Sequence, residues 1–210
     1  MSAESLESAL EGRFSPPLRA IEALSGYVDL VLKWNLSINI IGKSTADQIW
    51  QRHVLDSAQL FTCATADQRL WLDIGSGGGF PGMVVAILAR DLCPDLRVGL
   101  VESDQRKAVF LSECARQLGL AVTVHRKRVE SLEPQGADVL SARALAPLAD
   151  LCSYAERHLK PGGMGAFLKG ANLDLEIVEA QSKWSFQVDR APSITDSKAA
   201  MVFLRDLRRV

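Results

Sequence analysis

The sequence lacks any apolar run long enough to cross a bilayer, which takes about twenty consecutive residues. Its N-terminal stretch is polar and acidic and shows no signal-peptide pattern. A membrane-spanning or secreted protein is therefore not indicated, and we expect a cytoplasmic protein.

Cysteine and histidine are also scarce, with four residues of the first and three of the second. No cysteine belongs to a C-x-x-C pair or has a histidine at ligand spacing. The cysteines are Cys63, Cys93, Cys114 and Cys152. This pattern is typical of free thiols in a reducing compartment. It argues against structural zinc and against an iron–sulfur cluster, and we expect no bound metal.

An excess of positive charge is absent too, because the net charge is −1 over 210 residues. A protein that coats nucleic acid with a generally basic surface is excluded, so any such contact must come from local patches. The hydrophobic content of 48% is ample for a core. The length predicts one large domain, or one domain with an appendage, and nothing demands more than a monomer.

What the sequence does contain is a glycine-rich turn between an apolar strand and an apolar helix. The strand is predicted over Leu70–Ile74, the turn reads GSGGGFPG over residues 75–82, and the helix follows over residues 83–89. This is the first unit of a parallel α/β sheet. Glycine permits positive φ and close approach to a ligand. Because ligands of such sheets bind beyond the carboxyl ends of the strands, we expect a site above this turn.

Two acidic residues indicate which cofactor the turn binds. A second strand, over residues 97–101, ends in Glu102, where a carboxylate commonly binds a ribose diol. The letters GGGFPG also fit the dinucleotide pattern G-x-G-x-x-G, so an NAD-dependent oxidoreductase is one interpretation. However, Asp73 would repel a pyrophosphate at the helix N-terminus. S-adenosylmethionine has no phosphate and carries a sulfonium and an ammonium group, so Asp73 favours that cofactor.

The remainder of the chain alternates between helices and strands. We expect strands over residues 121–125, 137–141 and 165–168, and a final antiparallel pair over residues 184–189 and 199–204. Helices are expected over residues 104–118 and 147–159, and from about residue 173. The predicted fold is α/β, a doubly wound, seven-stranded, Rossmann-like methyltransferase domain over residues 66–210.

Residues 1–65 predict a helical cap. Ser15 is the expected N-cap of a helix that ends near Trp34. A capping box formed by Thr45 and Gln48 is expected to open a second helix, which carries His53.

Motifs spread over nearly the whole chain carry a family resemblance. The cap contributes KWN at residues 33–35, Asn39, and RHVLDS at residues 52–57. The turn contributes DIGSGGGFPG, and RVE at 128–130, SARA at 141–144 and LKG at 168–170 follow. Together they resemble the glucose-inhibited division protein B family, bacterial methyltransferases that act on guanine N7 in the 530 loop region of 16S ribosomal RNA. One departure is Ile40-Ile41-Gly42, where the family usually has a leucine and a threonine.

The resemblance implies S-adenosyl-L-methionine as the cofactor, and 16S ribosomal RNA or the small ribosomal subunit as the partner. It implies cofactor contacts at Gly75, Phe80, Val129, Glu130 and Arg143. Added to those that the glycine turn and the strand ends predict, the expected cofactor residues are Asp73, Gly75, Gly77, Phe80, Glu102, Val129, Glu130 and Arg143. For Arg143 the alternative is an ion pair with a neighbouring carboxylate such as Asp73 or Glu102.

The candidates for RNA binding are polar or basic residues on the ligand side, namely Asn39, His53, Arg126, Lys127, Arg128, Arg143 and Lys169. Basic side chains hold phosphates without reading the base sequence. Structural alternatives stay open for several of them. Asn39 is also suited to bonding its own loop backbone. His53 is also suited to a boundary position where Asp56 holds it. The basic run of Arg126, Lys127 and Arg128 is also typical of a solvated surface.

The implied reaction needs no general base, because guanine N7 has an in-plane lone pair and no proton to lose. Direct in-line attack then depends on holding the reacting atoms in line. This agrees with a sequence that shows no obvious acid–base dyad. Besides the NAD-dependent oxidoreductase, a small-molecule methyltransferase and a non-catalytic RNA- or S-adenosylmethionine-binding assembly factor remain as alternatives.

Overall fold

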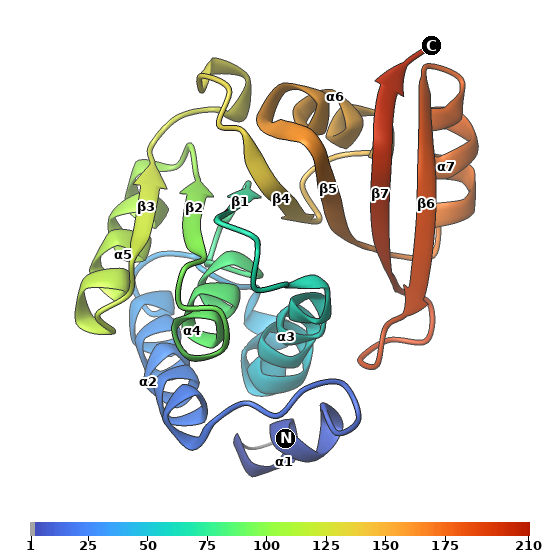
Figure 1. Ribbon diagram of the computed structural model, residues 1–210. Helices are drawn as coiled ribbons and strands as arrows, with labels where there is room; N and C mark the ends of the chain where they lie inside the picture. Colours follow the sequence, from blue (N-terminus) through green and yellow to red (C-terminus); the bar gives the residue numbers. More distant parts are fainter. Residues whose placement is uncertain (1–2) are drawn as a thin grey trace.

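The computed structural model describes residues 3–210, which form a seven-stranded sheet with helices on both faces (Figure 1). The strand order is β3-β2-β1-β4-β5-β7-β6. The strands are β1 Leu70–Ile74, β2 Arg97–Val101, β3 Val122–His125, β4 Ala137–Arg143, β5 Leu159–Lys169, β6 Trp184–Pro192 and β7 Ala200–Arg209. Strands β1 to β5 run parallel, whereas β7 is antiparallel to both β5 and β6. The doubly wound sheet with an antiparallel edge hairpin is confirmed.

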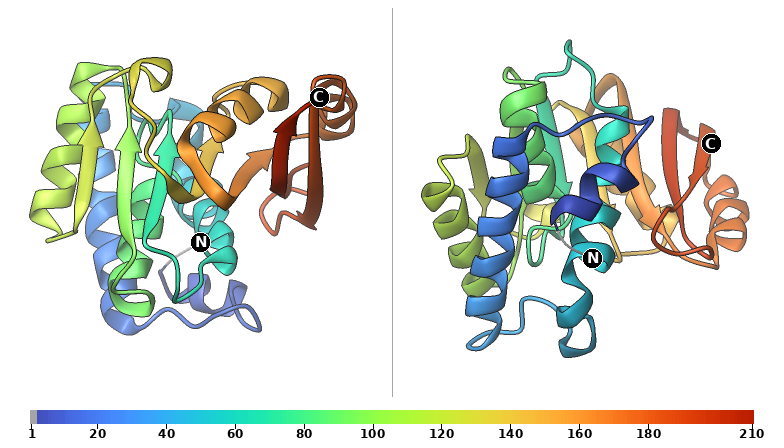
Figure 2. Two further views of the ribbon diagram at one scale, coloured as in Figure 1. Left: turned by 45° about the horizontal axis from the view of Figure 1, so that its top comes forward. Right: turned by 90° about the horizontal axis from the view of Figure 1, so that it is seen from below.

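The helices divide between the two faces of this sheet. They are α1 Ala3–Ala9, α2 Leu18–Asn35, α3 Asp56–Ala58, α4 Gly82–Leu92, α5 Gln105–Gln117, α6 Leu148–His158 and α7 Leu173–Gln181. Helix α4 packs on β1 and β2 and is covered in turn by α2 and α3, while α6 and α7 pack together on the other side (Figure 2). None of the helices among these residues is long and apolar enough to cross a membrane.

The two ends of helix α5 are set by residues close to them in the sequence. The side chain of Asp104 accepts hydrogen bonds from the backbone N–H groups of Arg106 at 2.8 Å and Lys107 at 3.2 Å, which makes it a true N-cap. Gly119 has φ of 62° just past the other end, a conformation that suits glycine. Because both signals are local, the sequence predicted this helix closely.

The cap differs from the prediction in detail. Helix α2 begins after Pro17, which makes no side-chain capping bond, so Ser15 is not its N-cap. Thr45 lies inside a 3₁₀ helix, Lys43–Gln48, and its hydroxyl donates to the carbonyl of Gly42 at 2.9 Å. The predicted capping box is therefore wrong. The second cap helix is not continuous either, because a π-helix over Trp50–Leu55 leads into α3 and a 3₁₀ helix over Gln59–Cys63. Such π segments occur frequently at functional sites.

Two hydrophobic clusters hold the layers together, one on each face of the sheet. The larger cluster contains Leu24 of α2 and Phe61 of the cap together with Ile87 of α4, so the cap shares its core with the sheet. The smaller cluster contains Leu151 of α6 and Phe167 of β5. The cap is consequently fixed against α4, directly beside the turn that follows β1.

Candidate active site

The glycine turn after β1 forms the floor of the site. Gly75, Gly77 and Gly79 have φ of 62°, 54° and 83°, a region that other residues enter only with strain. The turn is held from both sides. Its Gly77 N–H donates to a carboxylate oxygen of Glu102 at 2.7 Å, and the hydroxyl of Tyr27 on α2 donates to the carbonyl of Gly78.

Two adjoining cavities open at the carboxyl ends of the parallel strands. The smaller, of about 220 Å³, is lined by Gly75, Gly77, Glu102, Lys127, Arg128, Val129, Glu130, Leu145 and Tyr154, among others. The larger, of about 640 Å³, is lined by Gly75, Gly77, Phe80, Arg143, His53, Thr45, Lys169 and Thr195, among others. Lys107 also lines both. The shared glycines and Lys107 make the two cavities parts of one cleft, and this brings together all the expected cofactor residues except Asp73.

In the smaller cavity, Glu102 is fixed by the backbone. One carboxylate oxygen accepts from Gly77, and the other accepts from the N–H of Asp104 at 2.7 Å. A carboxylate has about four acceptor positions, so both oxygens keep capacity for a ligand hydroxyl. Beside it, Glu130 accepts a hydrogen bond from the hydroxyl of Tyr154 at 2.8 Å, and Val129 offers an apolar wall.

Asp73 lies beneath the turn and lines neither cavity. Its side chain is fully buried, and one carboxylate oxygen accepts from the hydroxyl of Ser141 at 2.7 Å. The other oxygen has no hydrogen-bond partner among the residues that the structure describes. Burial raises the pKa of Asp73 to about 6, although the hydrogen bond from Ser141 acts to lower it. The glycine turn therefore lies between the carboxylate of Asp73 and the cleft, so Asp73 can act on a bound ligand by its charge and not by direct contact.

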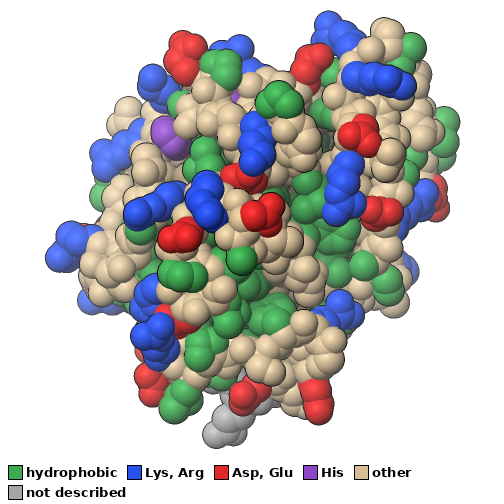
Figure 3. All heavy atoms as spheres, in the orientation of Figure 1, with side chains coloured by type: hydrophobic (Ala, Val, Ile, Leu, Met, Phe, Trp, Pro, Cys, Tyr) green, Lys and Arg blue, Asp and Glu red, His purple; other side chains and the backbone are tan. Residues whose placement is uncertain are grey.

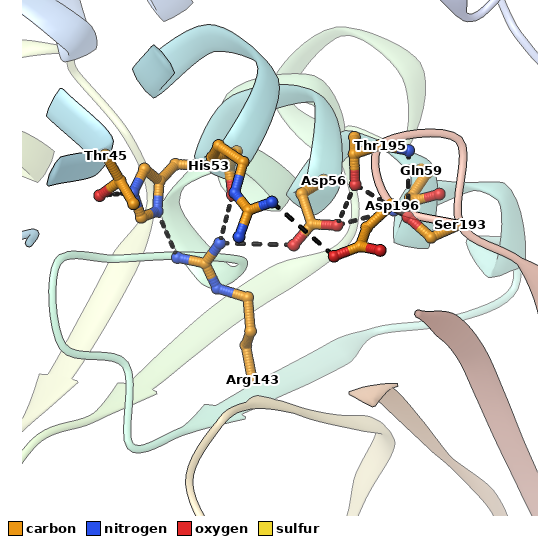
Figure 4. A network of polar contacts seen from close by, with 9 residues as sticks. Thr45, His53, Asp56, Gln59, Arg143, Ser193, Thr195 and Asp196 are labelled. Carbon is orange, nitrogen blue, oxygen red and sulfur yellow. Dashed lines mark hydrogen bonds and ion pairs between the residues drawn. The ribbon is translucent and has the colours of Figure 1, made fainter. Parts of the chain in front are cut away.

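Arg143, at the end of β4, lines the larger cavity and points toward the cap residues His53 and Asp56 (Figure 4). Its guanidinium donates to the carbonyl of Arg52 at 2.8 Å and lies 3.4 Å from a carboxylate oxygen of Asp56. It also lies over the ring of Phe80, 5.3 Å from the ring centroid. The alternative expected for Arg143, an ion pair with a neighbouring carboxylate, is present, but the partner is Asp56 of the cap and not Asp73 or Glu102.

His53 is held between two partners. Its Nδ1 is 2.7 Å from Nη2 of Arg143, and its Nε2 is 2.9 Å from the hydroxyl of Thr45. The alternative in which Asp56 holds His53 is wrong, since Asp56 bonds Arg143, Gln59 and Thr195 instead. Burial, together with the positive charges of Arg143 and Arg52, lowers the pKa of His53 to about 4.

The remaining RNA-binding candidates are spread around the cleft. Asn39 is exposed beside Lys107, while the backbone of its loop is held by Asn35, whose side-chain oxygen accepts from Ile40 and Ile41. Lys169 lines the larger cavity, but its ammonium pairs with Glu176 at 2.5 Å, and only 9% of its side chain is exposed.

The basic run after β3 consists of Arg126, Lys127 and Arg128, and these side chains point to two different places. Lys127 and Arg128 line the smaller cavity, whereas the guanidinium of Arg126 lies 3.5 Å from the hydroxyl of Ser112 on α5. On the face drawn in Figure 3, hydrophobic side chains gather in the middle, and basic and acidic side chains are interspersed around them. The basic side chains on that face are therefore scattered among acidic ones and do not gather in one patch.

Sequence reasoning missed several residues that build this site. Lys107 lines both cavities, and Tyr27 supports the turn. Gln59 is fully buried and bonds both Asp56 of the cap and the segment at Ser193 and Ile194. A polar residue between the apolar Ala58 and Leu60 was an available signal for it. No group of three potential metal ligands occurs within residues 3–210.

Comparisons with known proteins identify the family of this chain. The family model GidB, described as rRNA small subunit methyltransferase G, matches residues 20–203. A protein of Cereibacter sphaeroides, named "Ribosomal RNA small subunit methyltransferase G", is 54% identical over 189 residues, which are 90% of this chain and 92% of that protein. A protein of the same name from a Ruegeria species is 45% identical over 190 residues, or 90% and 92% of the two chains.

Solved structures support the fold. A SAM-dependent methyltransferase from Aquifex aeolicus superposes with a TM-score of 0.58 at 14% identity, covering 78% of this chain and 98% of that one. The family match spans the cap segment that holds Arg143 as well as the sheet domain. The chain therefore belongs to the GidB family of small-subunit ribosomal RNA methyltransferases, as the sequence motifs predicted.

Proposed function

We propose that this protein transfers a methyl group from S-adenosyl-L-methionine to N7 of a guanine in the 530 loop region of 16S ribosomal RNA. The observation that carries the proposal is the two-part cleft, whose parts meet at Gly75 and Gly77. The smaller part suits an adenosine, and the larger part has room for a methionine moiety together with an incoming base.

The residues present fit this cofactor. Glu102 is held at the strand end with acceptor capacity for a ribose diol, and Val129 supplies apolar surface for an adenine face. The buried carboxylate of Asp73 lies behind the turn, and within residues 3–210 one of its oxygens has no hydrogen-bond partner. A dinucleotide's pyrophosphate would lie against that negative charge, which is why the oxidoreductase is the weaker alternative. When bound, the cofactor supplies a methyl group on a sulfonium centre.

The side chains around the larger cavity are suited to holding a base rather than to moving a proton. His53 is neutral and engaged on both ring nitrogens, and Arg143 is engaged by the cap. A guanine N7 has a lone pair and no proton, so direct in-line transfer requires no general base. The contribution of this chain is proximity and orientation.

The RNA is the partner, and Lys107, Lys127 and Arg128 give the lining of the smaller part of the cleft positive charge. We assign residues 1–65 as a cap that shapes the larger cavity and residues 66–210 as the cofactor-binding domain. A loop of single-stranded RNA with an unstacked base is the form that this cleft can receive. The protein would meet that RNA, or the small subunit, in the cytoplasm as a monomer, without a bound metal.

The test is methyl transfer from labelled S-adenosylmethionine to small ribosomal subunits from a strain that lacks this protein. We expect 7-methylguanosine on digestion and mass analysis, located in the 530 loop region by fragment mapping. Methylation of another nucleotide would contradict the proposed position. Cofactor binding without transfer would favour the non-catalytic assembly factor, and binding of NADH instead would favour the oxidoreductase.

A further inference from the structure

The loop between β6 and β7 lines part of the larger cavity and is bonded to the cap. The loop covers residues 193–199, and Thr195, Asp196 and Ala199 line the larger cavity beside Arg143. Between the cap and this loop the polar contacts form a continuous chain (Figure 4). Strand pairing alone does not account for contacts between segments so distant in sequence.

Asp56 is the junction of this chain of contacts. One of its carboxylate oxygens lies 3.4 Å from Nη1 of Arg143. The other oxygen accepts from the hydroxyl of Thr195 at 2.8 Å and from the amide of Gln59 at 3.0 Å. The side chain of Asp56 is only 16% exposed, so its orientation depends on these donors.

Gln59 holds the loop at two points. Its amide nitrogen donates to the hydroxyl of Ser193 at 3.0 Å, and its amide oxygen accepts from the N–H of Ile194 at 3.1 Å. Ser193 and Thr195 are themselves 2.8 Å apart through their hydroxyls. Since Gln59 is fully buried, removing any one of these bonds would leave an unsatisfied polar group.

We propose that the β6–β7 loop is a positioning element for Arg143, with Thr195 and Gln59 acting on its guanidinium through Asp56. The inference rests on the proposed function, because it assigns these residues to the same methyl-transfer site. The loop sets which way Asp56 presents the oxygen that faces Arg143, and Asp56 then sets where the guanidinium lies over Phe80. Neither Thr195, Gln59 nor Asp56 needs to touch the RNA or the cofactor to act in this way.

Thr195→Val is the most direct variant, because it keeps the side-chain shape and removes only the hydroxyl. We expect it to lower kcat/KM for methyl transfer by between about tenfold and about a hundredfold, the effect of displacing a positioning group by about 1 Å. Thr195→Ser restores the hydroxyl and should recover the rate to within about twofold of wild type, on the same reasoning. Thr123→Val, on the exposed edge strand β3, is the matched control and should leave the rate unchanged.

A double-mutant cycle with Arg143→Lys separates positioning from direct contact. If Thr195 acts through Arg143, Thr195→Val should have little further effect in the Arg143→Lys background. Both single variants should also change the same parameter, either kcat or KM. Additive effects would overturn the inference, because they would mean that Thr195 touches the substrate itself or stabilises only the fold. An unchanged rate in Thr195→Val with a wild-type melting temperature would overturn it too.

The cycle remains readable if the proposed function fails. Should the wild-type protein methylate a different nucleotide, total methyl transfer serves as the readout. Should it transfer no methyl group, the same four proteins are compared by calorimetry with S-adenosylmethionine. Coupling between Thr195 and Arg143 in that binding constant would uphold the inference, and its absence would refute it.

Discussion

The guanidinium of Arg143 donates to Nδ1 of His53 across 2.7 Å, and this contact defines the protonation state of the imidazole. Arginine is a donor only, so Nδ1 must carry the lone pair. The proton of His53 then lies on Nε2, which faces the hydroxyl of Thr45 at 2.9 Å. A neutral histidine in this place agrees with its lowered pKa of about 4.

Protonating His53 should therefore destabilise the protein. The unfolded chain takes up a proton below a pKa of 6.5, whereas the folded protein does so only near 4. Between these values the unfolded state binds more protons, so this group's contribution to stability is present above pH 6.5 and is lost as the pH falls to about 4. His53→Gln should flatten this part of the curve of unfolding free energy against pH. An identical slope in the variant would refute the assignment.

Asp73 should change the free energy of unfolding with pH in the opposite direction to His53. Its pKa rises from 3.8 to about 6 on folding, so its contribution to stability is present below 3.8 and is lost as the pH rises to about 6. Over the same range its ionisation should strengthen the binding of a cationic cofactor. Calorimetry at about pH 5 and about pH 7 should show tighter S-adenosylmethionine binding at the higher pH in the wild type. Asp73→Asn should remove that difference, and a difference that persists would exclude Asp73 as its source.

Gly82 should not tolerate a side chain. A Cβ atom there would overlap Leu100 Cδ2 and would lie 2.7 Å from Asp73 Cβ. Gly82→Ala should destabilise the protein by about 1–3 kcal/mol, the usual cost of overpacking. The matched control is Gly26→Ala inside α2, where the new Cβ meets only Leu118 at 3.7 Å. That variant should stabilise the protein by about 0.5–1 kcal/mol. Chemical denaturation measures both, and equal effects would contradict the packing argument.

The two halves of the basic run should differ in RNA binding. Lys127→Glu with Arg128→Glu should weaken binding to a 530-loop RNA and flatten its salt dependence, by about 0.7 in the logarithmic slope for each phosphate that is no longer neutralised. Arg126→Glu should change the slope less, because its guanidinium lies toward Ser112 on α5. Binding titrations at several salt concentrations test this. Equal slopes for the two variants would mean that the run acts as a diffuse surface charge.

Much of this protein follows from local sequence. Three local signals act within a few residues, and the structure contains all three. They are the apolar strand before the glycine turn, the helix N-cap Asp104 and the helix stop at Gly119. The alternation of strands and helices then leaves a parallel sheet as the natural arrangement. The family motifs supplied the remaining expectations, because they are spread over nearly the whole chain.

Only the tertiary structure decided the partners of the charged residues. The pairing of Arg143 with Asp56 joins β4 to the cap, and the bond between Asp56 and Thr195 joins the cap to the last hairpin. The pairing of Lys169 with Glu176 likewise joins β5 to α7 and engages the ammonium of a predicted phosphate ligand. Sequence periodicity shows which face a residue occupies, but it does not show which distant segment meets that face. Partner choice depends on how the layers pack, and that is set by the hydrophobic core of the whole chain.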